Sequence, residues 1–319
     1  MIIFSLLFEF LRIGCLSDDS RYINSNFAGI SNISGCFFTR TFLYNGNGGV
    51  ISITATGFNL NVENSIFYDC GVTEIAGAIY FTSSGSVLKN VCARKCYANT
   101  GVGKGCQFCR IETLESGKND LNVVSFVYCP DSQAIERSYS TYIINGIQKW
   151  NSLNGSNCYL LHICSRTYNP NSFSDIFSTY CNNRMKLVTA YHFSYGSNTR
   201  ASSYINIINN TQDTDSSGIV HLETSGVFSI SHSVCSNNNK FLFTSTGTLI
   251  VTNSIVSHSS SSLISGTVTI TNNISNIHPN SPSTYNLMHH QCTLSTAFNT
   301  YQQKSIFQPV FIILILPWP

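Results

Sequence analysis

The chain has 319 residues, a formal net charge of +2 and only 10% charged side chains, against about 25% in average globular proteins. This balance excludes a strongly basic nucleic-acid-binding protein and gives no electrostatic reason to expect an anionic membrane surface as partner. Hydrophobic residues make up 43% of the chain and aromatic residues 12%, which excludes the composition of a disordered protein.

Residues 1–16 are apolar, but Glu9 and Arg12 interrupt them and no basic residue precedes them. A signal peptide begins with positive charge and continues with an unbroken apolar run. Two interpretations stay open for this segment: a degenerate signal peptide, or the first coil of a chain whose true start is missing.

Residues 17–129 contain a repeat marked by three glycines, Gly49, Gly77 and Gly105, spaced 28 residues apart. Each glycine opens a short apolar strand, and a second strand with period-two alternation follows it. We expect each repeat to form one coil of at least two strands.

Asparagine and cysteine recur at fixed places in these coils. Asn64 and Asn90 each precede a cysteine by six residues, Cys70 and Cys96 respectively. Asparagine tolerates the left-handed backbone of a tight corner and can hydrogen-bond a neighbouring coil. We expect both residue types to stack above their counterparts in the next coil.

Residues 130–199 have irregular spacing, with Asn, Pro and aromatic insertions between strand-like pieces. We interpret them as coils with protruding loops, not as a separate domain. Because Tyr, Trp150, Phe and Asn concentrate in residues 131–199, as they do at recognition surfaces, we expect these loops to bind a partner.

Residues 200–276 hold the clearest repeat, opened by Gly226, Gly247 and Gly266 at intervals of 21 and 19 residues. Stacking the copies on these glycines aligns four columns, Phe228/Leu249/Val268, Ile230/Val251/Ile270, Val234/Ile255/Ile274 and His232/Asn253/Asn272. A unit this short cannot bury its own apolar face and must pair with its neighbours. We therefore predict an all-β solenoid of about nine parallel coils.

Residues 277–319 form a tail whose apolar segment, 306–316, contains Pro309. This segment is shorter than the roughly 20 residues that span a bilayer. It is either a truncated membrane anchor or a hydrophobic tail without a function of its own.

The pieces Gly48-Gly49-Val50-Ile51 and Ala76-Gly77-Ala78-Ile79 resemble right-handed parallel β-helix proteins of the pectin-lyase-like fold, as do the asparagines Asn64, Asn90, Asn253 and Asn272. More closely, the chain resembles the surface families that include the chlamydial polymorphic outer-membrane proteins and their relatives in trichomonad protists. The resemblance implies a right-handed β-helix at the cell surface or secreted, often anchored by a C-terminal membrane helix. It also implies an adhesin-like role, with a host-cell or matrix protein or a glycan as partner.

The same fold includes pectate lyases and polygalacturonases, which need clustered carboxylates. The one local acidic cluster, Asp213-Thr214-Asp215, lacks the Gly-His-Gly and Arg-x-Lys partners of polygalacturonases. We interpret it as an exposed turn and expect no catalytic residue and no cofactor. A carbohydrate-active or carbohydrate-binding β-helix remains the alternative, and would place three carboxylates, or a carboxylate with Arg, on one exposed face. A partial or decayed copy from a repetitive surface-protein family is a further alternative.

The chain has 13 cysteines and four Asn-x-Ser/Thr sequons. Four of the cysteines could bind zinc only if the fold brought them together; they are Cys92, Cys96, Cys106 and Cys109. We favour cysteines stacked between coils and expect no metal site. The sequons offer the glycosylation candidates Asn32, Asn154, Asn209 and Asn273.

Overall fold

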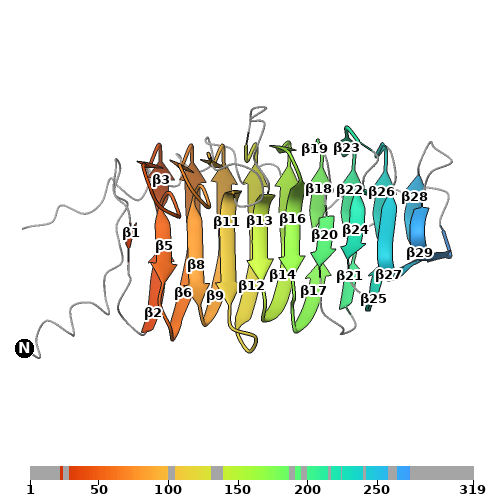
Figure 1. The fold of residues 1–319 in the computed structure, drawn as a ribbon, viewed down its shortest axis with the longest axis horizontal. Helices are drawn as coiled ribbons and strands as arrows, with labels where there is room; N and C mark the ends of the chain where they lie inside the picture. Colours follow the sequence, from red (N-terminus) through yellow and green to blue (C-terminus); the bar gives the residue numbers. More distant parts are fainter. Residues whose placement is uncertain are drawn as a thin grey trace, which may run out of the picture.

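The computed structural model describes residues 22–23, 29–99, 105–130, 139–186, 191–194, 200–214, 217–223, 225–239, 242–257 and 264–273. Within these ranges all regular elements are β-strands, and the strands pair in parallel. The chain is therefore an all-β parallel solenoid, as predicted, with successive coils side by side along one axis (Figure 1). The expectations for residues 1–16 and 277–319 fall outside the described residues.

One ladder of strands forms what we term the first face. Its strands are β1 (Tyr22–Ile23), β5 (Ile51–Thr54), β8 (Ile79–Ser83), β11 (Cys106–Thr113), β13 (Tyr139–Ile144), β16 (Ile163–Tyr168), β20 (Tyr191–Ser194), β24 (Val220–Glu223), β27 (Phe243–Thr252) and β29 (Ile264–Thr271). Each strand belongs to a different coil, so residues far apart in the chain become neighbours here.

A second ladder follows around the coil, and the long strands β27 and β29 extend into it. Its other strands are β2 (Gly29–Ser34), β6 (Phe58–Tyr68), β9 (Gly85–Arg94), β12 (Lys118–Val127), β14 (Ile147–Ser156), β17 (Ser172–Ile176), β21 (Arg200–Ser203) and β25 (Val227–Ser231). The second halves of β6, β9, β12 and β14 continue past a corner into a third ladder with β3 (Phe37–Thr39), β18 (Thr179–Cys181), β22 (Asn206–Ile208), β26 (Val234–Ser236) and β28 (Ile255–Ser257).

Two small sheets complete the described coils. Their strands have two residues each: β4 (Phe42–Leu43), β7 (Gly71–Val72) and β10 (Tyr97–Ala98) in one, and β15 (Tyr159–Leu160), β19 (Arg184–Met185) and β23 (Thr211–Gln212) in the other.

The core is built from rows of inward side chains, one residue per coil. Period-two alternation sends every second strand residue inward, and the parallel register stacks these residues. One row of the first face is Ile53, Phe81, Ile111, Ile143, Thr167, Phe193 and Leu222, all buried. Burying a large apolar side chain contributes about 1.5–3 kcal/mol, so stability accumulates coil by coil.

The register of the last coils matches the alignment predicted from the glycine spacing. Phe228 pairs with Leu249 and Leu249 with Val268. The same strands pair Ile230 with Val251. The spacing predicts this register because the side chains repeat at constant distance from each glycine.

The alignment of Gly105 with Gly77 does not hold. It would place Gln107 beside Ile79, whereas Cys109 is the partner of Ile79. The partner of Ile79 is thus two residues further along the chain than predicted, and β11 has a register irregularity between Cys106 and Cys109, where it advances three residues while β13 advances two. The strand begins before this bulge, and the apolar pattern of the sequence does not reveal the bulge.

The six repeat glycines do not share one structural role. An added Cβ would collide with the backbone oxygen of Gly77 at Gly49, and with that of Gln107 at Gly77, so close approach of successive coils requires glycine at both. Gly105 and Gly226 accept hydrogen bonds from backbone amides of the next coil, Tyr139 N (3.1 Å) and Thr248 N (3.1 Å). Gly247 and Gly266 lie within β27 and β29, and Gly266 has a φ of 95°.

The predicted corner asparagines have left-handed backbones. Asn64 and Asn90 have φ of 49° and 53°, and Asn253 and Asn272 have φ of 49° and 52°. Asn90 Nδ2 donates to Asn64 Oδ1 (3.0 Å), and Asn272 Nδ2 donates to Asn253 Oδ1 (3.0 Å). These corners therefore carry ladders of side-chain amides from coil to coil.

Cys70 and Cys96 are buried at a second corner. Cys70 Sγ lies 3.7 Å from the Phe38 carbonyl oxygen, and Cys96 Sγ lies 3.6 Å from that of Phe67, so each thiol reaches the preceding coil. Burial raises the pKa of both thiols, which keeps them protonated. Cys129 and Cys158 are also buried, unpaired thiols that follow a left-handed residue.

In later coils, asparagine occupies the position at this corner that cysteine occupies in earlier coils. Asn183 donates its backbone N–H and its Nδ2 to Asn210 Oδ1 (3.1 and 3.0 Å). Asn210 donates in the same way to Asn238 Oδ1 (2.9 and 3.1 Å). All three are at most 3% exposed, so this interior row links coils through satisfied buried amides.

The central segment is more regular than its sequence suggests. Between residues 139 and 186, β13 to β19 continue the ladders in register. Trp150 is 1% exposed and packs edge-on against Phe173, with ring centroids 4.9 Å apart. The expectation that Trp150 lies on a recognition surface is wrong, because β14 directs this indole into the core.

Candidate functional site

The outward positions of the first face carry a row of polar and aromatic side chains. Because register pairs Arg110 with Tyr142, Tyr142 with Arg166, Arg166 with His192 and His192 with His221, these five residues follow one another across adjacent coils. The inward alternates, such as Phe193 and Leu222, fill the core. The row therefore exists because the strands alternate and the coils stack.

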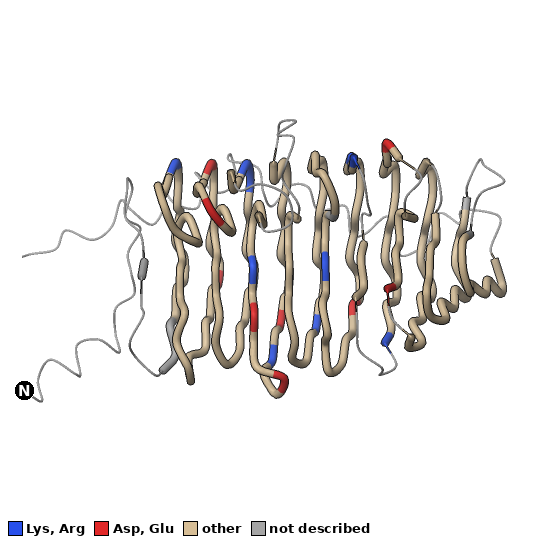
Figure 2. The backbone as a smooth tube through the Cα atoms, viewed as in Figure 1, with Lys and Arg blue, Asp and Glu red and all other residues tan. Residues whose placement is uncertain are grey.

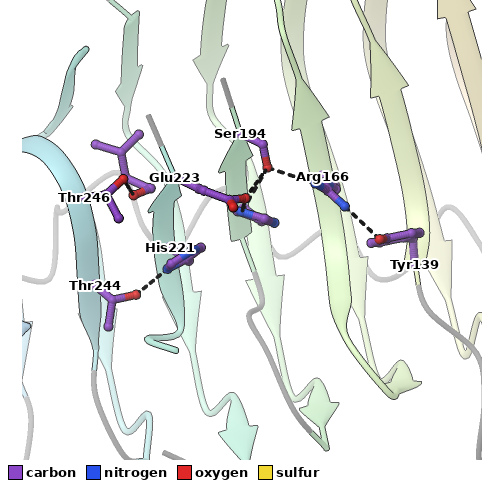
Figure 3. Close-up of polar contacts among 9 residues, drawn as sticks. Tyr139, Arg166, Ser194, His221, Glu223, Thr244 and Thr246 are labelled. Atoms are coloured by element: carbon purple, nitrogen blue, oxygen red, sulfur yellow. Dashed lines mark hydrogen bonds and ion pairs between the residues drawn. The ribbon is translucent and has the colours of Figure 1, made fainter. Parts of the chain in front are cut away.

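Arg166 on β16 is the best-supported cation of this row. Its guanidinium donates to Tyr139 Oη (2.7 Å) and to Ser194 Oγ (3.1 Å). It lies 5.0 to 5.5 Å from the ring centroids of Tyr139, Tyr142 and Tyr168, within cation–π range. Aromatic rings and two hydrogen bonds therefore fix this positive charge on the face; Figure 3 shows Arg166 between Tyr139 and Ser194.

Two histidines and a glutamate lie beside Arg166. His192 Nε2 is 3.4 Å from Glu223 Oε2, and the imidazole rings of His192 and His221 have centroids 4.8 Å apart. Ser194 Oγ lies 3.0 Å from His192 Nε2 and donates to Glu223 Oε2 (3.2 Å). Ser194 thus connects the Glu223 carboxylate with the Arg166 guanidinium, as Figure 3 shows.

The protonation states follow from burial and from these contacts. Burial lowers the pKa of His192 to about 4, against the effect of the hydrogen bond to Glu223. Burial also lowers the pKa of His221. The hydrogen bond with His192 lowers the pKa of Glu223 to about 2. At neutral pH the site holds two neutral imidazoles, one carboxylate and one guanidinium.

Each histidine also has a distinct hydrogen-bonding state. His221 Nδ1 lies 2.6 Å from Thr244 Oγ1 of the next coil, which orients the imidazole ring. His192 Nδ1 is buried with no hydrogen-bond partner among the described residues. Neutral imidazoles and a carboxylate can accept or donate hydrogen bonds and can ligate a cation.

This face meets the condition set for the carbohydrate-related alternative. A carboxylate, Glu223, and an arginine, Arg166, converge on it, and the Glu223 side chain is 42% exposed. A second carboxylate–arginine pair, Glu112 and Arg110, lies on the same face at 3.3 Å. Of the acidic turn expected at residues 213–215, Asp213 pairs with Arg184 of β19 at 3.2 Å, away from this cluster, and Asp215 lies outside the described residues.

Among the described residues, Cys92, Cys96, Cys106 and Cys109 do not form a group of three or more metal-ligating side chains within reach of one another. Cys96 and Cys109 belong to the main core, Cys106 packs with Ala76 and Tyr139, and Cys92 packs with Ile66 and Val127. In the described part of the chain, His192, His221 and Glu223 form the one group of three or more metal-ligating side chains within reach of one another.

Three of the four glycosylation candidates have exposed side chains: Asn32, Asn209 and Asn273. Asn154 is only 6% exposed. A glycan must project into solvent, so Asn154 does not suit this modification in the folded protein.

Sequence reasoning did not find the histidine cluster. The signal for it was present, because Tyr191-His192-Phe193-Ser194 and Val220-His221-Leu222-Glu223 share a period-two pattern at one coil's distance. An alignment of these two strands would have placed both histidines outward and side by side.

No protein-family model, curated protein or solved structure matches the chain. Over the described ranges, the structure contains no helix of the length and hydropathy that a membrane crossing requires.

Proposed function

We propose that the chain is a non-catalytic binding protein and that the outward side of its first face carries the recognition surface. The single observation behind this proposal is the fixed guanidinium of Arg166 among Tyr139, Tyr142 and Tyr168. Arginine and tyrosine are enriched at the energetic centres of interfaces. Side chains that are already ordered lose little conformational entropy on binding.

The distribution of charge supports the same face. Figure 2 shows Lys, Arg, Asp and Glu scattered sparsely over a largely uncharged solenoid. Against this background, the first face combines two arginines and two glutamates, Arg110, Arg166, Glu112 and Glu223. Three tyrosine rings surround Arg166 on the same face. A mixed polar and aromatic surface of this kind suits a partner that offers both hydrogen bonds and apolar contacts.

The finer assignments belong to this proposal as well. We place the protein at the cell surface or outside the cell, with a host-cell or matrix protein or a glycan as partner. The resemblance to pectin-lyase-like surface proteins and the exposed sequon residues Asn32, Asn209 and Asn273 support this. We propose a right-handed coil, since crossovers between parallel strands of one sheet are almost always right-handed.

A carbohydrate ligand is the second candidate, favoured by the approach of Arg166 and Glu223 through Ser194. Carboxylates and guanidinium groups form paired hydrogen bonds with polar ligands, and tyrosines supply apolar ring surface. On this hypothesis the same face binds, or acts on, a polysaccharide.

Two measurements test the proposed location and surface. A membrane-impermeant label and a glycosidase-induced mobility shift, applied to the protein in its native cell, should both give a positive result. A product that remains inside the cell and unglycosylated would contradict the surface assignment.

Binding of the purified chain to arrays of matrix proteins and of glycans should then identify the partner class. We expect Arg166→Ala to abolish the signal. Arg184→Ala is the matched control, because Arg184 also stacks on a tyrosine, Tyr159 (5.2 Å), but lies on β19. Equal binding by the two variants would refute the first face as the recognition surface, and release of polysaccharide fragments would refute the non-catalytic assignment.

A further inference from the structure

We infer that His192, His221 and Glu223 form a binding site for a first-row divalent cation, for which zinc fits best, on the outward side of β20 and β24. This inference is independent of the proposed binding function. It rests on the ligand set, the strand register and the distances of the cluster.

The register brings the three ligands together from two adjacent strands. His192 is the direct partner of His221, and Ser194 is the direct partner of Glu223. Parallel strands lie about 4.8 Å apart, and residues two apart in a strand point to the same face. The three side chains therefore share one small area of the face without any loop rearrangement.

The distances are close to those of a metal site. Zinc bonds nitrogen and oxygen at about 2.0–2.2 Å, so two ligands in tetrahedral geometry lie about 3.4 Å apart. His192 Nε2 and Glu223 Oε2 are 3.4 Å apart. The ligand atoms of all three residues lie within 4.8 Å of one another, near the spacing that one shared cation requires.

The chemistry of the donors selects the metal. Imidazole nitrogen suits zinc and its neighbours in the first transition row, whereas calcium and magnesium prefer oxygen. Two histidines and one glutamate form a known zinc ligand set that leaves a fourth position for water or another ligand. The Glu223 side chain, 42% exposed, gives the cation a route from solvent.

Neighbouring side chains both favour and disfavour cation binding at this site. Thr244 Oγ1, 2.6 Å from His221 Nδ1, can orient this imidazole as the outer partners of metal-bound histidines commonly do. Arg166 opposes the cation, because its guanidinium donates to Ser194 Oγ, which itself contacts both His192 and Glu223. Two like charges in one polar network repel, so Arg166 weakens binding.

Zinc titration of the chelator-treated full chain, with a chromophoric indicator, tests the site directly. We expect one zinc ion per chain. His221→Ala and Glu223→Gln should each weaken the zinc affinity by at least about tenfold, the least that altered metal sites commonly lose. His232→Ala is the matched control, because this exposed corner histidine stacks on Tyr204, away from the cluster, and should bind zinc as the parent does.

Arg166→Gln should bind zinc more tightly than the parent, a result that no mere loss of folding would produce. Cobalt in place of zinc should give the intense visible bands of a four-coordinate site without thiolate charge-transfer absorption. No saturable zinc binding, or binding that survives both His221→Ala and Glu223→Gln, would overturn the inference. Neither result depends on a partner array, so failure here leaves the proposed binding function separately testable.

Discussion

Asn210 is the central residue of the interior asparagine row, and its replacement by alanine tests how the coils are held in register. Asn210 Oδ1 accepts from Asn183 N and Nδ2 at 3.1 and 3.0 Å. Asn210 Nδ2 donates to Tyr180 O at 2.9 Å and to Asn238 Oδ1 at 3.1 Å. Asn210→Ala removes all four hydrogen bonds from a site that is 0% exposed.

The cost can be worked from these contacts. A hydrogen bond contributes about 0.5–1.5 kcal/mol net, and a buried donor left without a partner costs about 1–3 kcal/mol. The Asn183 backbone N–H loses its acceptor in the variant. We therefore expect a loss of about 4 kcal/mol in the local free energy of unfolding.

Native-state hydrogen exchange is the suitable assay, because a solenoid opens locally and its stability is a sum over neighbouring coils. A loss of about 4 kcal/mol accelerates exchange by roughly 10³-fold in peptides that cover β18 and β22. Asn59→Ala on the exposed side of β6 is the control, and should change exchange little. Acceleration of less than about tenfold in Asn210→Ala would refute the role of the row in holding the coils.

Three further substitutions test the core and the glycines. Burial raises the pKa of Asp175 from 3.8 to about 7, against the hydrogen bonds from Ser178 and Tyr191. The folded state therefore keeps a proton that the unfolded chain releases, so this contribution to stability is complete below about pH 4 and is lost as the pH rises through 7. In urea unfolding, the stability of Asp175→Asn should depend less on pH over this window than that of the parent. An unchanged slope of stability against pH would contradict the assignment. Gly77→Ala should destabilise the protein by more than about 2 kcal/mol, measured by urea unfolding. Gly35→Asn should cost less than about 1 kcal/mol of stability, because no atom lies within 4 Å of a Cβ added at Gly35 and asparagine tolerates the φ of 67° at this position. Equal losses of stability in the two glycine variants would disprove the close-approach explanation.

The sequence predicted the coils best where spacing alone determines their register. The pairing of Phe228 with Leu249 and Val268 follows from a constant distance to each glycine. The predicted register failed at Cys109, where the bulge in β11 adds one residue relative to β13 without disturbing the apolar pattern. The spacing of the glycines in the sequence gives the number of residues in a coil, whereas a bulge changes which residues of neighbouring coils pair.

The candidate site was harder to predict than the fold. Trp150 suggested a surface because aromatic residues are common at interfaces, yet its place in β14 directs it inward. His192 and His221 gave no local motif, since they lie in different strands. A site on a solenoid face becomes visible only when two properties are combined: the side of the strand on which a residue lies, and its partner in the next coil.

The interior rows and the outward site therefore depend on one another. A shift of one residue between β20 and β24 would turn either His192 or His221 toward the core, because side chains alternate with a period of two. The rows of buried asparagine and of serine, such as Ser233 N to Ser254 Oγ at 3.1 Å, connect coils at defined positions and oppose such a shift. The polar groups inside the solenoid thus keep the outward side chains of successive coils in line, including the three residues of the proposed cation site.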